Sequence, residues 1–265
     1  MDFFKIRERV VSKNSGTEIF PEFVVGKSQD IMIRGKSFMA IYDPETNLWS
    51  TDEGDVQRLV DNELRKYYNA HHSKEDDFRT TVRYMSSFSS NSWVNYCTYL
   101  SKMFDNYHTL DNKIIFSNTP VKKEDYVSHK LDYPLEAGDY SAWDELVGTL
   151  YEPFERHKIE WSIGAVVSGD SKNIQKFIVL YGPPGSGKST ILDVIEKLFS
   201  GYTTTFQASQ LVKRNNQFGT AAFKSNPLVA LQRDGDLSKI EDNSTLNTIV
   251  AHEPIQIRDL YERAF

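Results

Sequence analysis

The fold of this protein is decided by the stretch FIVLYGPPGSGKST, residues 177–190. Its first part, Phe177–Gly182, is a continuous apolar run, which is typical of a strand covered on both faces in a parallel sheet. A glycine-rich turn follows at once, and we expect a helix over Ser189–Phe199 after it. A strand, a turn and a helix in this order predict an α/β nucleotide-binding unit.

The turn carries a motif with a known physical mechanism. GPPGSGKST matches the pattern G-x-x-x-x-G-K-[ST] in full, in the strand-to-helix context that the pattern requires. Its glycines let successive backbone N–H groups point inward at phosphate oxygens, and the helix that begins near Lys188 adds its positive end. We expect Lys188 to reach the β- and γ-phosphates and Ser189 to hold Mg²⁺. The residues predicted to bind a nucleoside triphosphate are Gly182, Pro183, Pro184, Gly185, Ser186, Gly187, Lys188, Ser189 and Thr190.

Such a site needs an acidic side chain at the end of a second strand, to position Mg²⁺ and polarise the attacking water. The apolar run PLVALQ, residues 227–232, predicts that strand, and Asp234 and Asp236 follow it. Its position at the strand end favours Asp234. A solvated acidic turn is the alternative interpretation, and the neighbouring Arg233 can equally be a surface charge.

Composition limits the class of protein. The chain has 265 residues, 39% of them hydrophobic and 26% charged, which is ordinary for a globular protein. A net charge of −6 argues against a basic protein that coats nucleic acid, although a local basic patch remains compatible with it. The single cysteine, Cys97, excludes an internal disulfide and a Cys-rich zinc site. No apolar run approaches the about 18 residues of a membrane span, so we expect a cytoplasmic protein with no membrane partner.

The rest of the chain predicts a second, smaller domain. We expect residues 1–140 to form a mainly helical domain with a β-hairpin, and residues 141–265 to form the P-loop domain, with a helical run-in over 141–170. The expected elements are a hairpin over Ser37–Ser50, helices over Val56–Tyr68, Thr80–Ser87 and Ser92–Phe104, a strand over Lys113–Phe116, a helix capped by Ser141 and a helix from Pro153 to Gly169.

Beyond the P-loop, the chain resembles the superfamily-three helicase domain of phage/plasmid and poxvirus-type primase-helicases. The approach to their ATPase domain is similar to residues 129–182 here, where the matching phrases are Leu131-Asp132-Tyr133, Trp143, Ile163-Gly164 and Gln175-Lys176. Downstream, GDLSKIEDNSTLNTIVAHEPIQIRDLYERAF resembles the phrase that begins at the family's Mg²⁺ acid. The resemblance covers about Ser37 to Phe265, and this chain departs from it at Asn247 and at Ala251-His252-Glu253.

The resemblance implies an AAA+-like α/β P-loop NTPase that works as a ring, most often a hexamer. ATP would be hydrolysed with Mg²⁺ between subunits, and pore hairpins would move along single-stranded or forked DNA. It implies that Lys188 is catalytic and that the Mg²⁺ acid is Asp236, ranked above Asp234. By position, His252, Arg258 and Arg263 are the candidates for DNA contact. It also implies a primase domain or protein as a partner, and the host cytoplasm as the location.

The family continues past the phrase that ends here at Phe265, with a sensor strand and an arginine finger. We therefore expect a parallel sheet that is incomplete at its C-terminal end, and a native polypeptide that is longer or split. Two other functions fit the P-loop. One is a nucleotide or small-molecule kinase, which the late position of the P-loop in the chain argues against. The other is a catalytically idle ATP-binding assembly or loader protein, which the departures at Asn247 and 251–253 favour.

Overall fold

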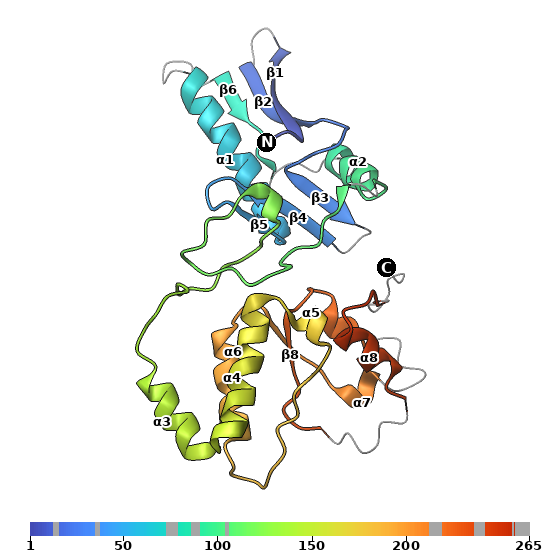
Figure 1. Cartoon of the computed structure of the whole chain (residues 1–265). Helices are drawn as coiled ribbons and strands as arrows, with labels where there is room; N and C mark the ends of the chain where they lie inside the picture. The colour runs from blue at the N-terminus through green and yellow to red at the C-terminus, as the bar shows by residue number, and fades with distance from the viewer. Residues whose placement is uncertain are drawn as a thin grey trace. The chain divides into compact units, whose positions relative to one another are not determined.

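The computed structural model divides the chain into two compact units, which are described separately. The first contains Met1–Thr109 and Val121–Ser128, and the second contains Leu110–Pro120 and His129–Phe265 (Figure 1). The structure describes residues 1–12, 16–34, 38–72, 79–85, 91–103, 106–211, 219–235, 242–255 and 257.

The described part of the first unit contains two small sheets, two α-helices and a short 3₁₀ helix. β1 and β2 pair antiparallel, with Phe4 opposite Phe23, and β6 adds to β2 in parallel. The second sheet has the order β3-β4-β5, all antiparallel. The elements are β1 (Phe4–Ser12), β2 (Gly16–Phe23), β3 (Ile31–Arg34), β4 (Phe38–Asp43), β5 (Leu48–Ser50), α1 (Glu53–His71), β6 (Thr80–Val82), α2 (Asn91–Leu100) and the short 3₁₀ helix η4 (Lys123–Asp125).

Several predictions for this unit are confirmed and others are wrong. The hairpin is present as β4 and β5, with Asn47 at φ 58° in its turn, and two of the predicted helices are α1 and α2. In its described residues the unit is not mainly helical, because alternating apolar residues make β1 and β2 an antiparallel ladder with one buried face. Thr80–Val82 is a strand rather than part of a helix. Its β-branched residues favour strand geometry, and its backbone pairs in parallel with the edge of β2.

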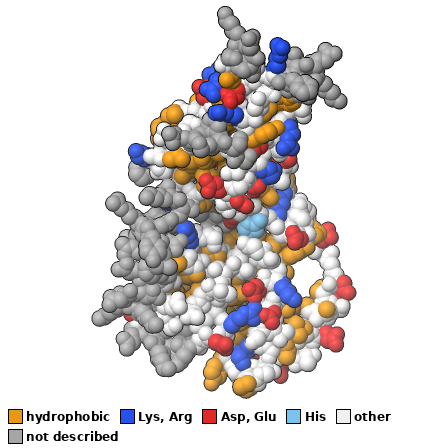
Figure 2. Space-filling model, turned by 180° about the vertical axis from the view of Figure 1, so that it is seen from behind, with side chains coloured by type: hydrophobic (Ala, Val, Ile, Leu, Met, Phe, Trp, Pro, Cys, Tyr) orange, Lys and Arg blue, Asp and Glu red, His pale blue; other side chains and the backbone are white. Residues whose placement is uncertain are grey.

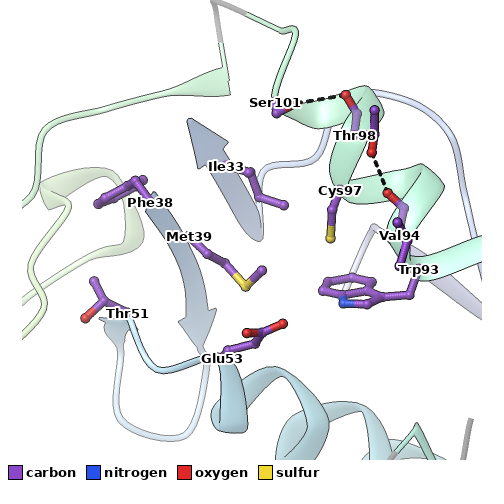
Figure 3. Close-up of a pocket in the computed structure, with 10 residues that line it drawn as sticks. All are labelled: Ile33, Phe38, Met39, Thr51, Glu53, Trp93, Val94, Cys97, Thr98 and Ser101. Carbon is purple, nitrogen blue, oxygen red and sulfur yellow. Dashed lines mark hydrogen bonds between the residues drawn. The ribbon is translucent and has the colours of Figure 1, made fainter. Parts of the chain in front are cut away.

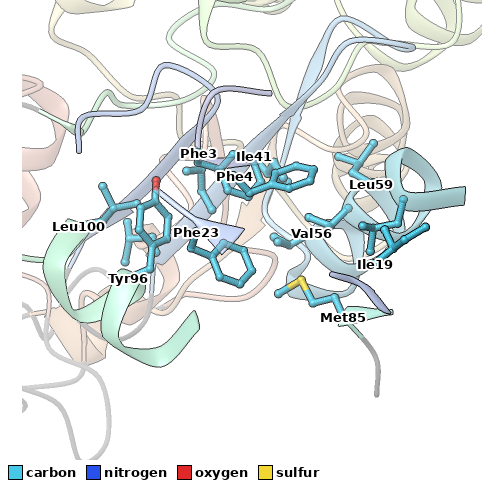
Figure 4. Packing of buried hydrophobic residues seen from close by; sticks show 14 residues of the cluster. Phe3, Phe4, Ile19, Phe23, Ile41, Val56, Leu59, Met85, Tyr96 and Leu100 are labelled. Atoms are coloured by element: carbon cyan, nitrogen blue, oxygen red, sulfur yellow. The ribbon is translucent and has the colours of Figure 1, made fainter. Parts of the chain in front are cut away.

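Aromatic and aliphatic side chains from both sheets and both helices form the core of the first unit (Figure 4). Phe3, Phe23 and Tyr96 lie with their rings nearly parallel, and Val56 and Leu64 bring the apolar side of α1 against the sheets. The unit therefore has a hydrophobic core of its own.

The second unit is also mixed α/β. Its helix α4 begins with Pro153 at the first helical position and ends at Gly169, which adopts the left-handed conformation, as predicted. β7 and β8 form a two-stranded parallel sheet, and β8 is the strand predicted after Pro227. The elements are α3 (Ser141–Leu150), α4 (Pro153–Ser168), α5 (Ser171–Ile174), α6 (Lys188–Leu198), β7 (Thr203–Thr205), α7 (Ala208–Leu211), η5 (Ala221–Phe223), β8 (Val229–Leu231) and α8 (Ser244–Val250).

The strand predicted before the P-loop does not form within the described structure. Phe177–Tyr181 runs as an extended connection between α5 and α6 (Figure 1), and none of the described strands pairs with it. Apart from the half-buried Leu180, its side chains are exposed, from 46% at Ile178 to 98% at Tyr181. A strand inside a parallel sheet has both faces covered. Only Leu180 packs, against the cluster beneath α6.

The units divide the chain differently from the boundary expected at 140/141. Leu131 and the predicted strand 113–116 pack with α6 and the residues after it, although 113–116 forms no strand. The Tyr202 hydroxyl donates to the His129 carbonyl oxygen over 2.8 Å and accepts from the Ile115 N–H over 3.1 Å. These buried contacts attach Leu110–Pro120 and the residues from His129 onward to the second unit.

Candidate functional site

The loop before α6 adopts a conformation that requires glycine. Gly185 and Gly187 have φ angles of 78° and 79°, and Gly187 is the N-cap of α6. At Gly182, a Cβ atom would lie 3.1 Å from the Ser186 hydroxyl oxygen. The backbone thus folds back on itself between Gly182 and Lys188, as the sequence predicted.

Lys188 lies inside this loop. Its half-buried ammonium donates to the carbonyl oxygens of Gly182 and Pro183, over 2.9 and 2.7 Å, and to the Ser186 hydroxyl over 3.1 Å. All three acceptors belong to the loop itself. The loop therefore surrounds the positive charge of Lys188. The ammonium can exchange its hydrogen bonds to the loop carbonyls for hydrogen bonds to phosphate oxygens.

Next to the lysine, the first turn of α6 is open to solvent. Ser189 and Thr190 are exposed, as are Pro183 and Pro184 on the loop. The first amides of a helix have no acceptor within the helix, and its dipole favours an anion at this end. The loop, the ammonium and the helix start together suit a polyphosphate.

Packing of α6 against α3 and α4 fixes the orientation of the loop. Ile191 is fully buried against Val147 and Ile159. Gly187 packs directly against Leu150 of α3, because a Cβ atom at position 187 would lie 2.6 Å from Leu150 Cδ1.

The two supporting helices are joined by polar contacts. The Trp143 indole N–H donates to Glu160 over 2.9 Å, and Arg156 bonds both Glu160, over 2.7 Å, and Asp144. The hydrogen bond from Trp143, and then that from Arg156, lower the pKa of Glu160.

The acidic turn follows β8. Leu231 is buried, whereas Asp234 is exposed three residues later. Asp236 lies outside the described residues, so the choice between the two acids stays a prediction.

Arg233 connects this turn to α6. Its guanidinium makes ion pairs with Asp193 and Glu196, and these contacts raise the pKa of the arginine. Ser189, Asp193 and Glu196 follow one another at spacings of four and three, so they share one face of the helix. Arg233 therefore connects the turn after β8 to the helix face that also carries Ser189. The Ser189 hydroxyl and the Asp234 carboxylate are hard oxygen ligands of the kind Mg²⁺ prefers, so these residues fit the ion.

The residues predicted to contact DNA are only partly described. His252 is exposed, at φ 54°, in the turn after α8, while Arg258 and Arg263 lie outside the described residues. Figure 2 shows one face of the molecule, on which acidic and basic side chains are interspersed with hydrophobic ones.

Sequence reasoning missed three residues that contact the loop, α6 or the acidic turn: Leu150, Gln232 and Arg233. Leu150 carried no signal, because its approach to Gly187 is a tertiary contact. For Arg233, the signal was a basic residue at a strand end combined with two acids three residues apart on the P-loop helix.

The first unit contains a cavity of about 500 Å³ that the sequence did not predict (Figure 3). Aromatic, aliphatic and sulfur-containing side chains form much of its lining, including Phe38, Met39 and Trp93. Glu53 supplies a carboxylate and Cys97 a thiol, and burial raises the pKa of that thiol to about 12. The cavity thus has a mixed apolar and polar lining, and its thiol is neutral near pH 7.

Within the described ranges, no three His, Cys, Asp or Glu side chains gather as a metal site. None of the described helices combines the length and the hydrophobicity that a membrane-spanning segment needs.

A family model described as a family of unknown function (DUF5906) matches residues 180–265, which contain the P-loop, α6 and the acidic turn. No curated protein matches the chain.

Proposed function

We propose that this protein is the ATP-driven DNA helicase module of a phage or viral primase-helicase. The observation that carries the proposal is that two parts contact α6. The glycine loop with Lys188 lies at its start, and the turn after β8 is bonded through Arg233 to the face that also carries Ser189. These are the parts that a P-loop NTPase needs on either side of its nucleotide.

The residues have separate tasks in this proposal. Lys188 exchanges its bonds to loop carbonyls for bonds to the β- and γ-phosphates of ATP, and the loop amides hold the phosphates in place. Ser189 and an acid after β8, ranked Asp236 before Asp234, would hold Mg²⁺. The chemistry that Mg²⁺ supplies when bound is neutralisation of charge on the phosphates. Water attacks the γ-phosphorus, the bond to the bridging oxygen breaks, and ADP and phosphate leave.

Assembly and DNA contact rest on the resemblance to superfamily-three helicases. The subunits form a ring, most often of six, in the cytoplasm of the host cell, and a neighbouring subunit supplies an arginine finger. Translocation along single-stranded DNA needs few positive groups, because they contact only the backbone, so a net charge of −6 is compatible with it. His252, Arg258 and Arg263 remain the candidates for that contact, and a primase remains the expected partner.

The test is steady-state ATP hydrolysis with and without single-stranded DNA, on protein whose mass in solution is measured. We expect DNA to stimulate turnover. Lys188→Ala should abolish turnover and weaken ATP binding, with an unchanged circular dichroism spectrum. Lys197→Ala is the matched control, since it removes an exposed positive charge from the last turn of the same helix.

Other outcomes identify other functions. Full activity of Lys188→Ala would contradict the P-loop assignment. Transfer of phosphate to a nucleoside or sugar would indicate a kinase, and binding without turnover would indicate an idle assembly or loader protein.

A further inference from the structure

Two adjacent residues after β8, Gln232 and Arg233, connect the acidic turn to two different helices. We infer that they are positioning residues, which hold the Asp234 turn beside the Ser189 face of α6. This inference rests on the proposed ATPase function and adds two residues that the P-loop pattern does not include.

Arg233 provides the contact to α6. One guanidinium nitrogen, Nη1, donates to Asp193 and the other, Nη2, donates to Glu196. The two acids lie one helical turn apart, so the planar guanidinium spans that turn and is fixed in direction along the helix. All three side chains are 39–53% exposed, and exposed ion pairs add little to stability. What the contact fixes is the place of the turn along α6.

Gln232 provides the contact to α7. Its half-buried side chain accepts from the backbone N–H of Ala208, at the start of α7, over 2.8 Å, and donates to the carbonyl oxygen of Asp234 over 2.9 Å. A Cβ atom at Gly235 would lie 2.0 Å from the Gln232 amide nitrogen, so the turn closes tightly around this side chain. The amide thus bonds the turn at Asp234, one of the two candidate Mg²⁺ acids.

The two contacts act in different directions. Gln232 bonds α7, whereas the next residue, Arg233, bonds α6. Asp234 follows both, so its backbone cannot shift along α6 without breaking one of them. Misplacement of a catalytic group by about 1 Å can cost about 100-fold in rate, so such contacts matter to turnover more than to folding.

The test compares Arg233→Ala, Arg233→Lys and Gln232→Ala with wild type and with Lys197→Ala. The readouts are affinity for a fluorescent ATP analogue without Mg²⁺, kcat, and the Mg²⁺ concentration that gives half-maximal turnover. For Arg233→Ala and Gln232→Ala we expect nucleotide affinity within about twofold of wild type, kcat lower by about tenfold or more, and a several-fold higher Mg²⁺ requirement. Arg233→Lys should recover only part of the loss, because an ammonium cannot span both acids.

A double-mutant cycle identifies the partners of Arg233. The combination of Asp193→Asn and Glu196→Gln should lower kcat about as much as Arg233→Ala does. Adding Arg233→Ala to that combination should lower kcat little further. Fully additive losses would show that Arg233 acts through other groups and would overturn the assignment.

Amide hydrogen exchange without nucleotide tests the contacts independently of activity. Residues 229–235 should exchange faster in Arg233→Ala and Gln232→Ala than in Lys197→Ala. Unchanged exchange would overturn the contacts, and faster exchange with unchanged kcat and Mg²⁺ requirement would overturn the positioning role. A wild-type protein that hydrolyses no ATP would overturn the proposed function and the positioning role together, whereas the exchange result would still decide whether the contacts hold the turn.

Discussion

Leu150 approaches Gly187 so closely that a Cβ atom at position 187 would lie 2.6 Å from Leu150 Cδ1. Gly187 is the N-cap of α6, and Leu150 is the last residue of α3. The end of one helix therefore abuts the glycine at the start of the other, which ties the P-loop conformation to the packing of α3.

Gly187→Ala should therefore lower both stability and nucleotide binding. An alanine held at a φ of 79° lowers the free energy of unfolding by about 1–3 kcal/mol, and the steric contact with Leu150 lowers it further. Urea unfolding and binding of a fluorescent ATP analogue measure the two effects. In a Leu150→Ala background, Gly187→Ala should lose only the stability that the backbone strain costs, because the steric contact with Leu150 is then absent. A Gly187→Ala protein as stable as wild type would contradict the loop conformation.

Tyr202→Phe should destabilise the second unit. Tyr202 is 2% exposed, and the change removes the donor to the His129 carbonyl and leaves the Ile115 N–H without its acceptor. A loss of about 1–3 kcal/mol in the free energy of unfolding is expected for a buried group left unsatisfied. Tyr181→Phe is the control, because that side chain is 98% exposed and should lose nothing. Equal stability of the two variants would argue against assigning residues 110–120 to this unit.

Acid should weaken the connection between α3 and α4. The pKa of Glu160 is lowered, first by Trp143 and then by Arg156, so its contribution to stability is complete above its ordinary pKa and is lost as pH falls through the lowered value. Melting temperatures measured from pH 7 to pH 3 should therefore fall less steeply in Trp143→Phe than in wild type below about pH 4.5. Parallel curves for the two proteins would show that this hydrogen bond does not set the pKa.

Cys97 should react slowly with thiol reagents. Burial, and then the charge of Glu53, raise its pKa to about 12, so almost all of the thiol is protonated at pH 8. The rate of iodoacetamide alkylation should keep rising with pH beyond pH 9, whereas the urea-unfolded chain should level off there. Glu53→Gln should speed the reaction modestly. A folded-state rate equal to the unfolded one would contradict the burial of Cys97.

The extended segment before the P-loop should exchange its amide hydrogens quickly. Phe177–Tyr181 has no strand partner among the described residues, whereas β7 and β8 pair with each other. Hydrogen exchange followed by mass spectrometry should show little protection over 177–181 and more over 203–205 and 229–231. Equal protection would show that a further strand covers the segment in solution.

Local patterns were enough to predict a good part of this molecule. The hairpin over β4 and β5, the helices α1, α2 and α4, and the glycine turn with Lys188 follow from turn residues, helical spacing, and the proline and glycine that bound α4. The wrong predictions concern segments whose structure depends on whether a distant strand pairs with them. Thr80–Val82 became a strand because β2 offered an edge, and Phe177–Tyr181 did not, because no described strand lies against it.

The sequence by itself determined the chemistry of the P-loop, since the conformations that glycine permits and the charge of Lys188 are properties of those residues and their order. Only the tertiary structure decided what supports that chemistry: Leu150 against Gly187, Arg233 on Asp193 and Glu196, and Gln232 inside the acidic turn. Each of these contacts joins residues distant in the chain or depends on how a side chain folds back, and periodicity and composition carry no information about either.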